Sequence, residues 1–217
     1  MVISKRSKDT YLFIKRVLDV SFAIILIGLT SPVLAVTAIV IKLTSKGPVI
    51  FRQIRLGRDK KPFSFYKFRS MYSGSSPEIH RQYIEKLMSE TEKKIGRAGG
   101  VHKLTDDPRI TMVGRIIRKT SIDELPQLFN VLKGDMSIVG PRPVIPYELK
   151  YYTTDMLERF CAKPGITGLW QVSKRYAVGY KEMVAIDILY ARNWSIWLDL
   201  KILVRTFPAV LKVSKTY

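Results

Sequence analysis

Asp123 and Glu124 are adjacent carboxylates in a strongly basic chain. The 217 residues include 37 Lys and Arg and 18 Asp and Glu, which gives a net charge of +19. Ser121, followed three residues later by Glu124, has the form of a capping box and predicts that both carboxylates lie in the first turn of a helix. Unpaired N–H groups there, with Arg118 and Lys119 just upstream, favour ionised carboxylates. Such carboxylates can attack phosphorus or ligate Mg²⁺; ordinary helix capping is the competing interpretation.

Three basic side chains are candidates for binding phosphate. Arg142 lies between Pro141 and Pro143, whose restricted backbone presents the guanidinium with little conformational freedom left to lose. A fixed guanidinium suits bidentate phosphate binding. Lys67 and Arg69 are two residues apart in an expected strand, so they fall on one face and could bind an anion. The competing interpretations are a surface arginine in a Pro-rich turn and solvated polar residues on a strand.

Composition narrows the function class. A net charge of +19 indicates a polyanionic partner such as nucleic acid, an anionic membrane surface or a phosphorylated substrate, and 47% hydrophobic residues exclude a basic disordered tail. Cys161 is the only cysteine, so no intrachain disulfide can form, and we expect it to be buried. With His80 and His102 as the only histidines, the sequence argues against a zinc site and a histidine-based hydrolytic triad.

The N-terminal stretch Val17 to Ile41 is apolar over 25 residues, with one charge at Asp19, and is long enough to cross a bilayer. Ser31-Pro32 falls near its centre, where proline kinks a helix and serine can satisfy a freed backbone group. Basic residues flank both ends, and the positive-inside rule then places both flanks on the cytoplasmic side. A helix that enters, bends and leaves by the same face fits these observations; a tilted, kinked spanning helix remains the alternative.

The rest of the chain reads as a compact set of short elements. Alternation of apolar and polar residues predicts a two-stranded hairpin over 49–57 and 63–71. Helical spacing predicts helices over 78–97, 113–119 and 125–132, the last of them ending at Gly134, and a mostly helical stretch over 182–211. Trp197 and its neighbours on the last helix suit either an interfacial membrane helix or a core-packed one. Asp106-Asp107, beside Pro108, is turn chemistry more readily than a metal site.

Four long motifs occur together and in order. They are Lys67-Phe-Arg-Ser-Met71, Arg118-Lys-Thr-Ser-Ile-Asp-Glu-Leu-Pro-Gln-Leu-Phe-Asn130, Gly134-Asp-Met-Ser-Ile-Val-Gly-Pro-Arg-Pro143 and Lys163-Pro-Gly-Ile-Thr-Gly-Leu-Trp-Gln171. In these motifs the chain resembles the bacterial sugar transferase family, the monotopic phosphoglycosyl transferases that start glycan assembly on undecaprenyl phosphate. The resemblance runs from about Tyr11 to the C-terminal helix. The 72–100 segment looks longer than in the smallest members, and no multi-helix bundle precedes Tyr11, as in the short form of the family.

The resemblance implies a reaction and roles for the candidate residues. A sugar 1-phosphate would pass from a UDP-sugar to undecaprenyl phosphate with release of UMP and a requirement for Mg²⁺. By motif, Asp123 would be the nucleophile that forms a phosphosugar-enzyme intermediate, and Glu124 would hold the metal. Six further motif residues would bind substrate. Arg118 and Arg142 would be the main phosphate ligands, Lys67 and Arg69 are weaker candidates, and Pro141 and Pro143 would shape the loop.

The resemblance also favours the re-entrant helix. The expected fold class is α+β, mainly helical with a small β-hairpin, in a monotopic membrane protein with an N-terminal re-entrant kinked helix. Residues 1–44 would form the basic segment and membrane helix, and residues 45–217 a catalytic domain with an interfacial C-terminal helix on the cytoplasmic face of the bacterial cytoplasmic membrane. The expected partners are the two substrates and membrane lipids, without nucleic acid, and a homodimer is one option for the oligomeric state.

Two other classes of function remain open at this point. A membrane-tethered nucleic-acid-binding protein would account for the net charge, although no helix-turn-helix, stacking motif or basic stripe is evident. A non-catalytic anchor that recruits glycan-assembly enzymes would tolerate the loss of Asp123. The sequence leaves the transferred sugar undetermined.

Overall fold

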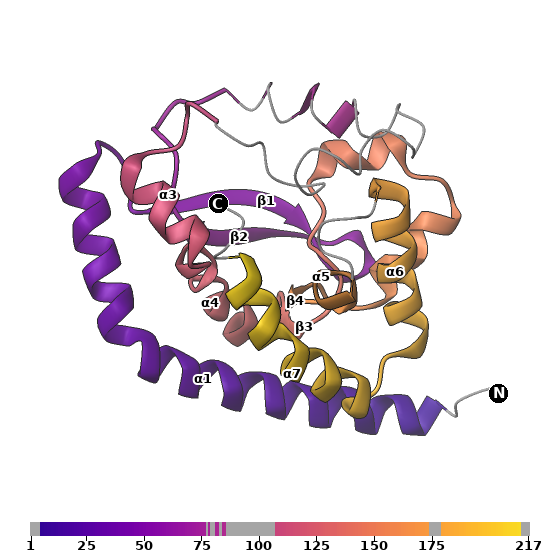
Figure 1. Cartoon of the computed structure of the whole chain (residues 1–217). Helices are drawn as coiled ribbons and strands as arrows, with labels where there is room; N and C mark the ends of the chain where they lie inside the picture. The colour runs from indigo at the N-terminus through magenta and orange to yellow at the C-terminus, as the bar shows by residue number, and fades with distance from the viewer. Residues whose placement is uncertain are drawn as a thin grey trace.

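The protein is mainly helical with a small antiparallel hairpin, as predicted (Figure 1). The computed structural model describes residues 5–76, 78, 81–82, 84–85, 107–173 and 179–213. Its elements are α1 (Lys5–Thr44), β1 (Ile50–Leu56), η1 (Arg58–Lys60), β2 (Pro62–Phe68), α3 (Met112–Lys119), η3 (Ile122–Glu124), α4 (Gln127–Lys133), β3 (Ser137–Val139), η4 (Pro146–Tyr151), η5 (Asp155–Cys161), β4 (Gly165–Thr167), α5 (Leu169–Ser173), α6 (Tyr180–Asn193) and α7 (Ile196–Val213). Most of the predicted helix 78–97, like Asp106, lies outside the described residues.

Helix α1 runs beneath the domain and then along one side of it (Figure 1). Pro32 lies inside the helix and has no N–H to donate to the carbonyl of Gly28 four residues earlier. The hydroxyl of Ser31 donates to that carbonyl at 2.8 Å and so satisfies it. Residues 10–44 are long and apolar enough to cross a membrane, and only 11% of their most apolar stretch is buried. An apolar helix with so little protein around it indicates a lipid environment rather than a core position.

Polar side chains on the inner face of α1 fasten its N-terminal half to the domain. Asp19, the one charge in the apolar stretch, is buried and accepts hydrogen bonds from the hydroxyl of Ser137 and the N–H of Ile138, both at 3.0 Å. Arg16 donates to two carbonyls at the C-terminal end of α4. Lys15 forms an ion pair of 2.6 Å with Asp199 of α7. The membrane helix therefore packs on the domain through specific charged groups.

The hairpin has the predicted antiparallel pairing, with Phe51 opposite Lys67 and Arg55 opposite Phe63. Residues directly opposite in such a pair share a face, so Arg55 and Lys67 lie on the same side of the hairpin. Helix α4 packs along β2 through Asn130, which is fully buried. Its side chain accepts from the N–H of Tyr66 at 3.0 Å and donates to the carbonyl of Ser64 at 2.7 Å. One amide therefore fixes α4, and the turn before it, against the hairpin.

A second two-stranded sheet, β3 with β4, is parallel and was not predicted. It joins the Gly134–Pro143 motif to the Lys163–Gln171 motif at very close range. A Cβ on Gly140 would lie 2.2 Å from the carbonyl oxygen of Lys163, and one on Gly165 would lie 2.0 Å from the nitrogen of Gly140. Glycine is needed at both positions because the two backbones are in contact. The close approach of these two loops therefore gives both glycines a packing role.

The principal core lies where the hairpin, α1, α4, β3 and α7 meet. Its largest buried members are Phe63, Phe65, Leu128, Val131, Met136, Tyr190 and Ile202. Gly134 ends α4 in the left-handed conformation at φ +89°, as predicted.

Two local predictions were wrong. Ser121 adopts a left-handed conformation at φ +58° and makes no side-chain capping bond, so the capping box does not form. The chain reverses direction at Ser121, between α3 and η3. This reversal requires a left-handed backbone at Ser121, whereas a capping residue normally has an extended backbone. The stretch 182–211 is mostly helical, as predicted, and consists of two helices because the backbone of Trp194 is extended between α6 and α7. Cys161 is exposed, since η5 lies on the surface.

Candidate active site

Asp123 and Glu124 lie in η3, a single turn of 3₁₀ helix between α3 and α4. The Asp123 side chain is buried, with only 6% of the residue exposed, and Glu124 is half-buried. Leu125 continues into α4 with helical angles, and η3 packs against β2 of the hairpin. The two carboxylates are thus held on a rigid corner, one inward and one nearer to solvent.

Lys67 lies beside this corner. Burial lowers the pKa of Lys67 to about 8; Asp123 opposes the shift, and the cations Arg55 and Arg118 reinforce it. Glu124 also acts to raise this pKa. The structure therefore brings together Asp123, Glu124, Lys67 and Arg118, which come from two motifs and from the three elements β2, α3 and η3.

Arg118 lies at the end of α3 and is half-buried. It acts electrostatically on two groups, lowering the pKa of both Lys67 and Asp107. Within the described part of the chain, its guanidinium has no hydrogen bond or ion pair. All of its donors therefore remain available to an incoming anion. Asp107 is held by Arg109 through two contacts of 2.6 and 2.8 Å, as expected for a turn residue.

Arg142 is held by Glu148, a fully buried carboxylate of η4, in an ion pair of 3.2 Å. Burial alone would raise the pKa of Glu148, but Arg142, the Tyr180 hydroxyl and Arg55 together lower it. Tyr180 donates to Glu148 at 2.6 Å. The guanidinium of Arg142 is therefore fixed in orientation by a charged partner that is itself hydrogen-bonded.

The backbone of Arg142 is held as firmly as its side chain. Its N–H donates to Asp187 of α6, and its carbonyl accepts from the buried Arg159 at 2.9 Å. Arg159 and Asp187 also form an ion pair with each other that is almost wholly buried. This network, reaching from η4 to α6, fixes the loop that carries Arg142.

Arg55 connects the two halves of the site. It donates to the carbonyl of Pro143 at 2.7 Å, and its charge acts on Glu148 and Lys67. Burial lowers the pKa of Arg55 to about 10, with Arg142 adding to the shift. Because Arg55 acts on both Lys67 and the Arg142–Glu148 pair, these groups belong to one charged region.

Arg69 has a different setting. It is buried, and it donates to the carbonyls of Ser45 and Lys46, both at 2.8 Å, at the C-terminal end of α1. Its charge therefore serves the negative end of that helix. Pro141 and Pro143 are buried, and their carbonyls accept from Gly165 and Arg55 respectively.

Sequence reasoning did not single out Arg55, Glu148, Arg159, Asp187 or Asn130. The signal for Arg55 was present, because the hairpin register puts it on the same face as Lys67. Glu148 lies in a polar, helix-like stretch and Asp187 in a mostly apolar helical one, and neither sequence context shows which partner the carboxylate has. Only the tertiary pairing identifies them.

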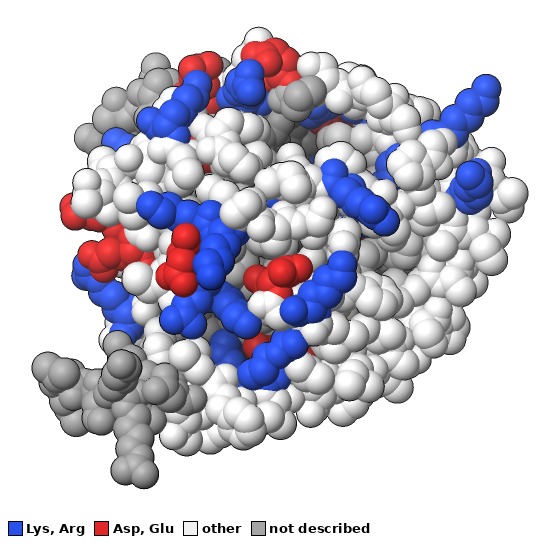
Figure 2. Space-filling view, turned by 180° about the vertical axis from the view of Figure 1, so that it is seen from behind, with Lys and Arg blue, Asp and Glu red and all other residues white. Residues whose placement is uncertain are grey.

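Charged side chains are distributed unevenly over the face of the molecule shown in Figure 2. There basic side chains surround a few acidic ones, while a broad part of the surface carries no charged side chain. Helix α1 also exposes many apolar residues, such as Phe13, Ile24 and Leu29.

A divalent cation fits the donor set at η3. Among the described residues, no group of three or more His, Cys, Asp or Glu side chains could form a complete protein site. Mg²⁺ does not need one, since it commonly takes one or two carboxylates and completes its shell with substrate phosphates and water. A half-buried Glu124 next to a buried Asp123 supplies that minimum.

Comparison with known proteins gives consistent results. The family model described as bacterial sugar transferase matches residues 10–213. Undecaprenyl-phosphate galactose phosphotransferase of Salmonella typhimurium is 44% identical over 219 residues, covering 99% of this chain and 43% of that protein. UDP-galactose-lipid carrier transferase of Erwinia amylovora is 42% identical, covering 100% and 44%. UDP-glucose:undecaprenyl-phosphate glucose-1-phosphate transferase of Caulobacter vibrioides is 40% identical, covering 94% and 72%.

The chain spans less than half the length of the first two relatives and most of the third. The match to the family covers all four motifs that suggested the resemblance, together with α1 from residue 10 onward. The resemblance is confirmed, and the chain belongs to the bacterial sugar transferase family.

Proposed function

We propose that this protein transfers a sugar 1-phosphate from a UDP-sugar to a polyprenyl phosphate at the cytoplasmic face of the bacterial cytoplasmic membrane. The observation that carries the proposal is that β2, which carries Lys67, and α3, which carries Arg118, both pack against η3, which carries Asp123 and Glu124. Both substrates are anionic, and such a cluster lowers the cost of bringing them to a carboxylate. The names of the relatives, which specify undecaprenyl phosphate and UDP-sugars, support the same reaction class.

In the first step the Asp123 carboxylate attacks the sugar-linked phosphorus of the donor. A P–O bond to aspartate forms, the diphosphate P–O bond breaks, and UMP leaves with the bonding pair. In the second step an oxygen of the polyprenyl phosphate attacks the same phosphorus and the bond to Asp123 breaks, which restores the carboxylate. Two displacements let donor and acceptor use one carboxylate in turn, so they need not bind together.

The cations have distinct tasks in this scheme. Arg142, held by Glu148, and Arg118, with its free donors, bind phosphate oxygens, while Lys67 lies beside the nucleophile. Glu124 would hold Mg²⁺, which would supply positive charge to neutralise the charge that develops on the leaving group. Arg69 holds the end of α1 near the site and acts on position rather than on substrate.

The direct test is a screen of UDP-sugars with undecaprenyl phosphate and Mg²⁺ in detergent or nanodiscs, measured as UMP formation. We expect one donor to give multiple turnovers, and no more than one equivalent of UMP per protein without acceptor. Removal of Mg²⁺ by a chelator should stop release. If no UDP-sugar yields UMP with any polyprenyl phosphate, the proposal is wrong.

We also propose that α1 is re-entrant. Ser31 satisfies the backbone group that Pro32 frees, and both ends of α1 carry basic residues, so a bent helix with both ends on one side is chemically complete. The test uses single cysteines at Lys8 and Lys46 in a Cys161→Ser background, because the native thiol is exposed and would react. A membrane-impermeant maleimide should label both positions from the cytoplasmic side. Labelling from opposite sides would mean a spanning helix.

Lys67 gives the reaction a pH dependence. Its pKa of about 8 means that it binds phosphate as a cation only below that pH, so kcat/KM for the UDP-sugar should fall as pH rises through 8. Lys67→Arg keeps the charge, and the alkaline fall should move to higher pH.

Deprotonation of Lys67 does not itself destabilise the folded chain. Between pH 8 and the ordinary lysine value of 10.5, Lys67 binds fewer protons in the folded chain than in the unfolded chain, so its contribution to stability increases with pH. An unchanged alkaline limb in Lys67→Arg would show that another group titrates.

A further inference from the structure

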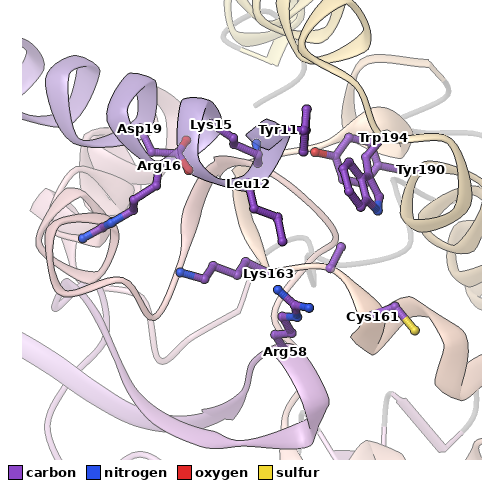
Figure 3. A pocket seen from close by; sticks show the side chains of 11 residues that line it. Tyr11, Leu12, Lys15, Arg16, Asp19, Arg58, Cys161, Lys163, Tyr190 and Trp194 are labelled. Carbon is purple, nitrogen blue, oxygen red and sulfur yellow. The ribbon is translucent and has the colours of Figure 1, made fainter. Parts of the chain in front are cut away.

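A cavity of about 160 Å³ lies between the N-terminal part of α1 and the segment that joins η5 to β4 (Figure 3). Four basic side chains line it: Lys15 and Arg16 from α1, Arg58 from the hairpin turn, and Lys163 from before β4. Asp19 is the one acidic residue in its lining. None of the candidate catalytic or substrate-binding residues described above lines this cavity.

The charges in the cavity are not balanced by the protein. Lys15 is paired with Asp199, and Arg16 donates to carbonyls of α4. Lys163, in contrast, has no hydrogen bond or ion pair within the described residues, and Arg58 has only a 3.7 Å contact with the exposed Asp59. Figure 3 shows the Lys163 side chain extending toward Arg16, with the guanidinium of Arg58 below it.

Like charge is crowded around Lys163. Its burial lowers the pKa of the amine, and the neighbouring Arg16 and Arg58 lower it further. Asp19 and Asp135 oppose this effect, but Asp19 already accepts hydrogen bonds from Ser137 and Ile138. A bound anion would relieve the repulsion among three cations, so the cavity favours one electrostatically.

The other end of the cavity is lined by apolar and aromatic side chains, some of them from α1. Tyr11 stacks on Trp194 with ring centroids 4.2 Å apart, and Leu12 points into the space (Figure 3). On the opposite side of the same turns of α1, Phe13 and Val17 are exposed. With that outer face in lipid, the cavity lies at headgroup level, where aromatic rings and basic groups are both favoured.

We propose that this cavity binds the phosphate group of an anionic phospholipid. Lys163 and Arg58 donate to the phosphate, while the Tyr11–Trp194 wall and Leu12 contact the apolar part of the molecule next to it. The proposal rests on the membrane position of α1 and is independent of the transfer reaction. A reacting acceptor phosphate must instead meet the phosphorus held at Asp123, which does not line this cavity.

The experiment measures binding of short-chain phosphatidylglycerol to the whole chain in a non-ionic detergent, by native mass spectrometry and titration. Dihexanoyl phosphatidylcholine and inorganic phosphate serve as comparison ligands, because they separate the anionic lipid from a neutral lipid and from free phosphate. We expect one tightly bound phosphatidylglycerol and on the order of tenfold weaker binding in Lys163→Gln. Lys163→Arg should retain binding, and Lys60→Gln, on an exposed lysine of η1, is the matched control.

Arg58→Gln tests the same site should the first variant not fold, and it should weaken binding to a similar degree. Three outcomes would overturn the proposal. They are binding to Lys163→Gln and Arg58→Gln as tight as to the parent chain, equal affinity for phosphatidylcholine, and equal affinity for inorganic phosphate. Because the readout is lipid binding, a failure here is distinguishable from absence of UMP release, which tests the transferase function.

Discussion

Asp123→Asn is expected to reduce UMP release on the order of 10,000-fold, because an amide cannot attack phosphorus and no second carboxylate occupies its buried position. The variant keeps the shape of the side chain, so folding and membrane binding should be unchanged. The measurement is UMP formation under turnover conditions, paired with intact-mass analysis after mixing with donor alone. The parent chain should gain the mass of one sugar phosphate, and the variant should gain none.

The matched control is Asp59→Asn. Asp59 is an exposed carboxylate on the hairpin turn at φ +56°, a conformation that asparagine accepts easily. Its activity should equal that of the parent chain. Substantial turnover by Asp123→Asn, or a covalent adduct on another residue, would refute the nucleophile assignment.

Arg142→Met is expected to lower both stability and activity. It leaves Glu148 fully buried without its cation, which costs about 3 kcal/mol of unfolding free energy, and it removes a phosphate ligand, which lowers kcat/KM on the order of 100-fold. The double variant Arg142→Met/Glu148→Gln removes the buried charge as well. It should recover most of the stability, because the Tyr180 hydroxyl can still donate to the amide oxygen of the introduced glutamine, but it should recover none of the activity.

Chemical denaturation and kcat/KM on the same samples separate the two effects. The exposed ion pair between Arg192 and Glu158 supplies the control, and Arg192→Met should leave the unfolding midpoint unchanged. If the double variant regained activity together with stability, Arg142 would be a structural residue only.

The hairpin and the helix stop at Gly134 could be predicted because each depends on neighbours in the chain. Alternation fixes the faces of β1 and β2, and a left-handed glycine ends α4. The three-residue strands β3 and β4 are too short to show a period, and their pairing depends on glycine contacts across a long loop. The capping box predicted at Ser121 was wrong because the motif is local, whereas the conformation of Ser121 is set by the chain reversal between α3 and η3.

The sequence could predict the charged residues of the candidate site but not the buried residues that hold them in place. Lys67 and Arg118 could be chosen by type and motif, and the structure places both around Asp123. Arg69 is two residues after Lys67, so alternation would place both on one face of a strand. However, β2 ends at Phe68, and the carbonyl of Ser45, at the C-terminal end of α1, determines where the Arg69 guanidinium points. Glu148 shows the opposite case, a residue whose importance depends wholly on being buried beside Arg142.

Asp19 links the membrane helix to β3, the strand that leads directly into the loop carrying Arg142. Helix α1 and the part of the domain that carries the candidate site are therefore mechanically continuous. Removing the first 44 residues to obtain a water-soluble fragment would remove the partners of several groups at once. The N–H of Ile138 and the carbonyls at the end of α4 would lose their hydrogen bonds to α1, and the guanidinium of Arg69 would lose the helix end that it binds. Preparations of this protein should accordingly retain α1 and a bilayer or detergent belt.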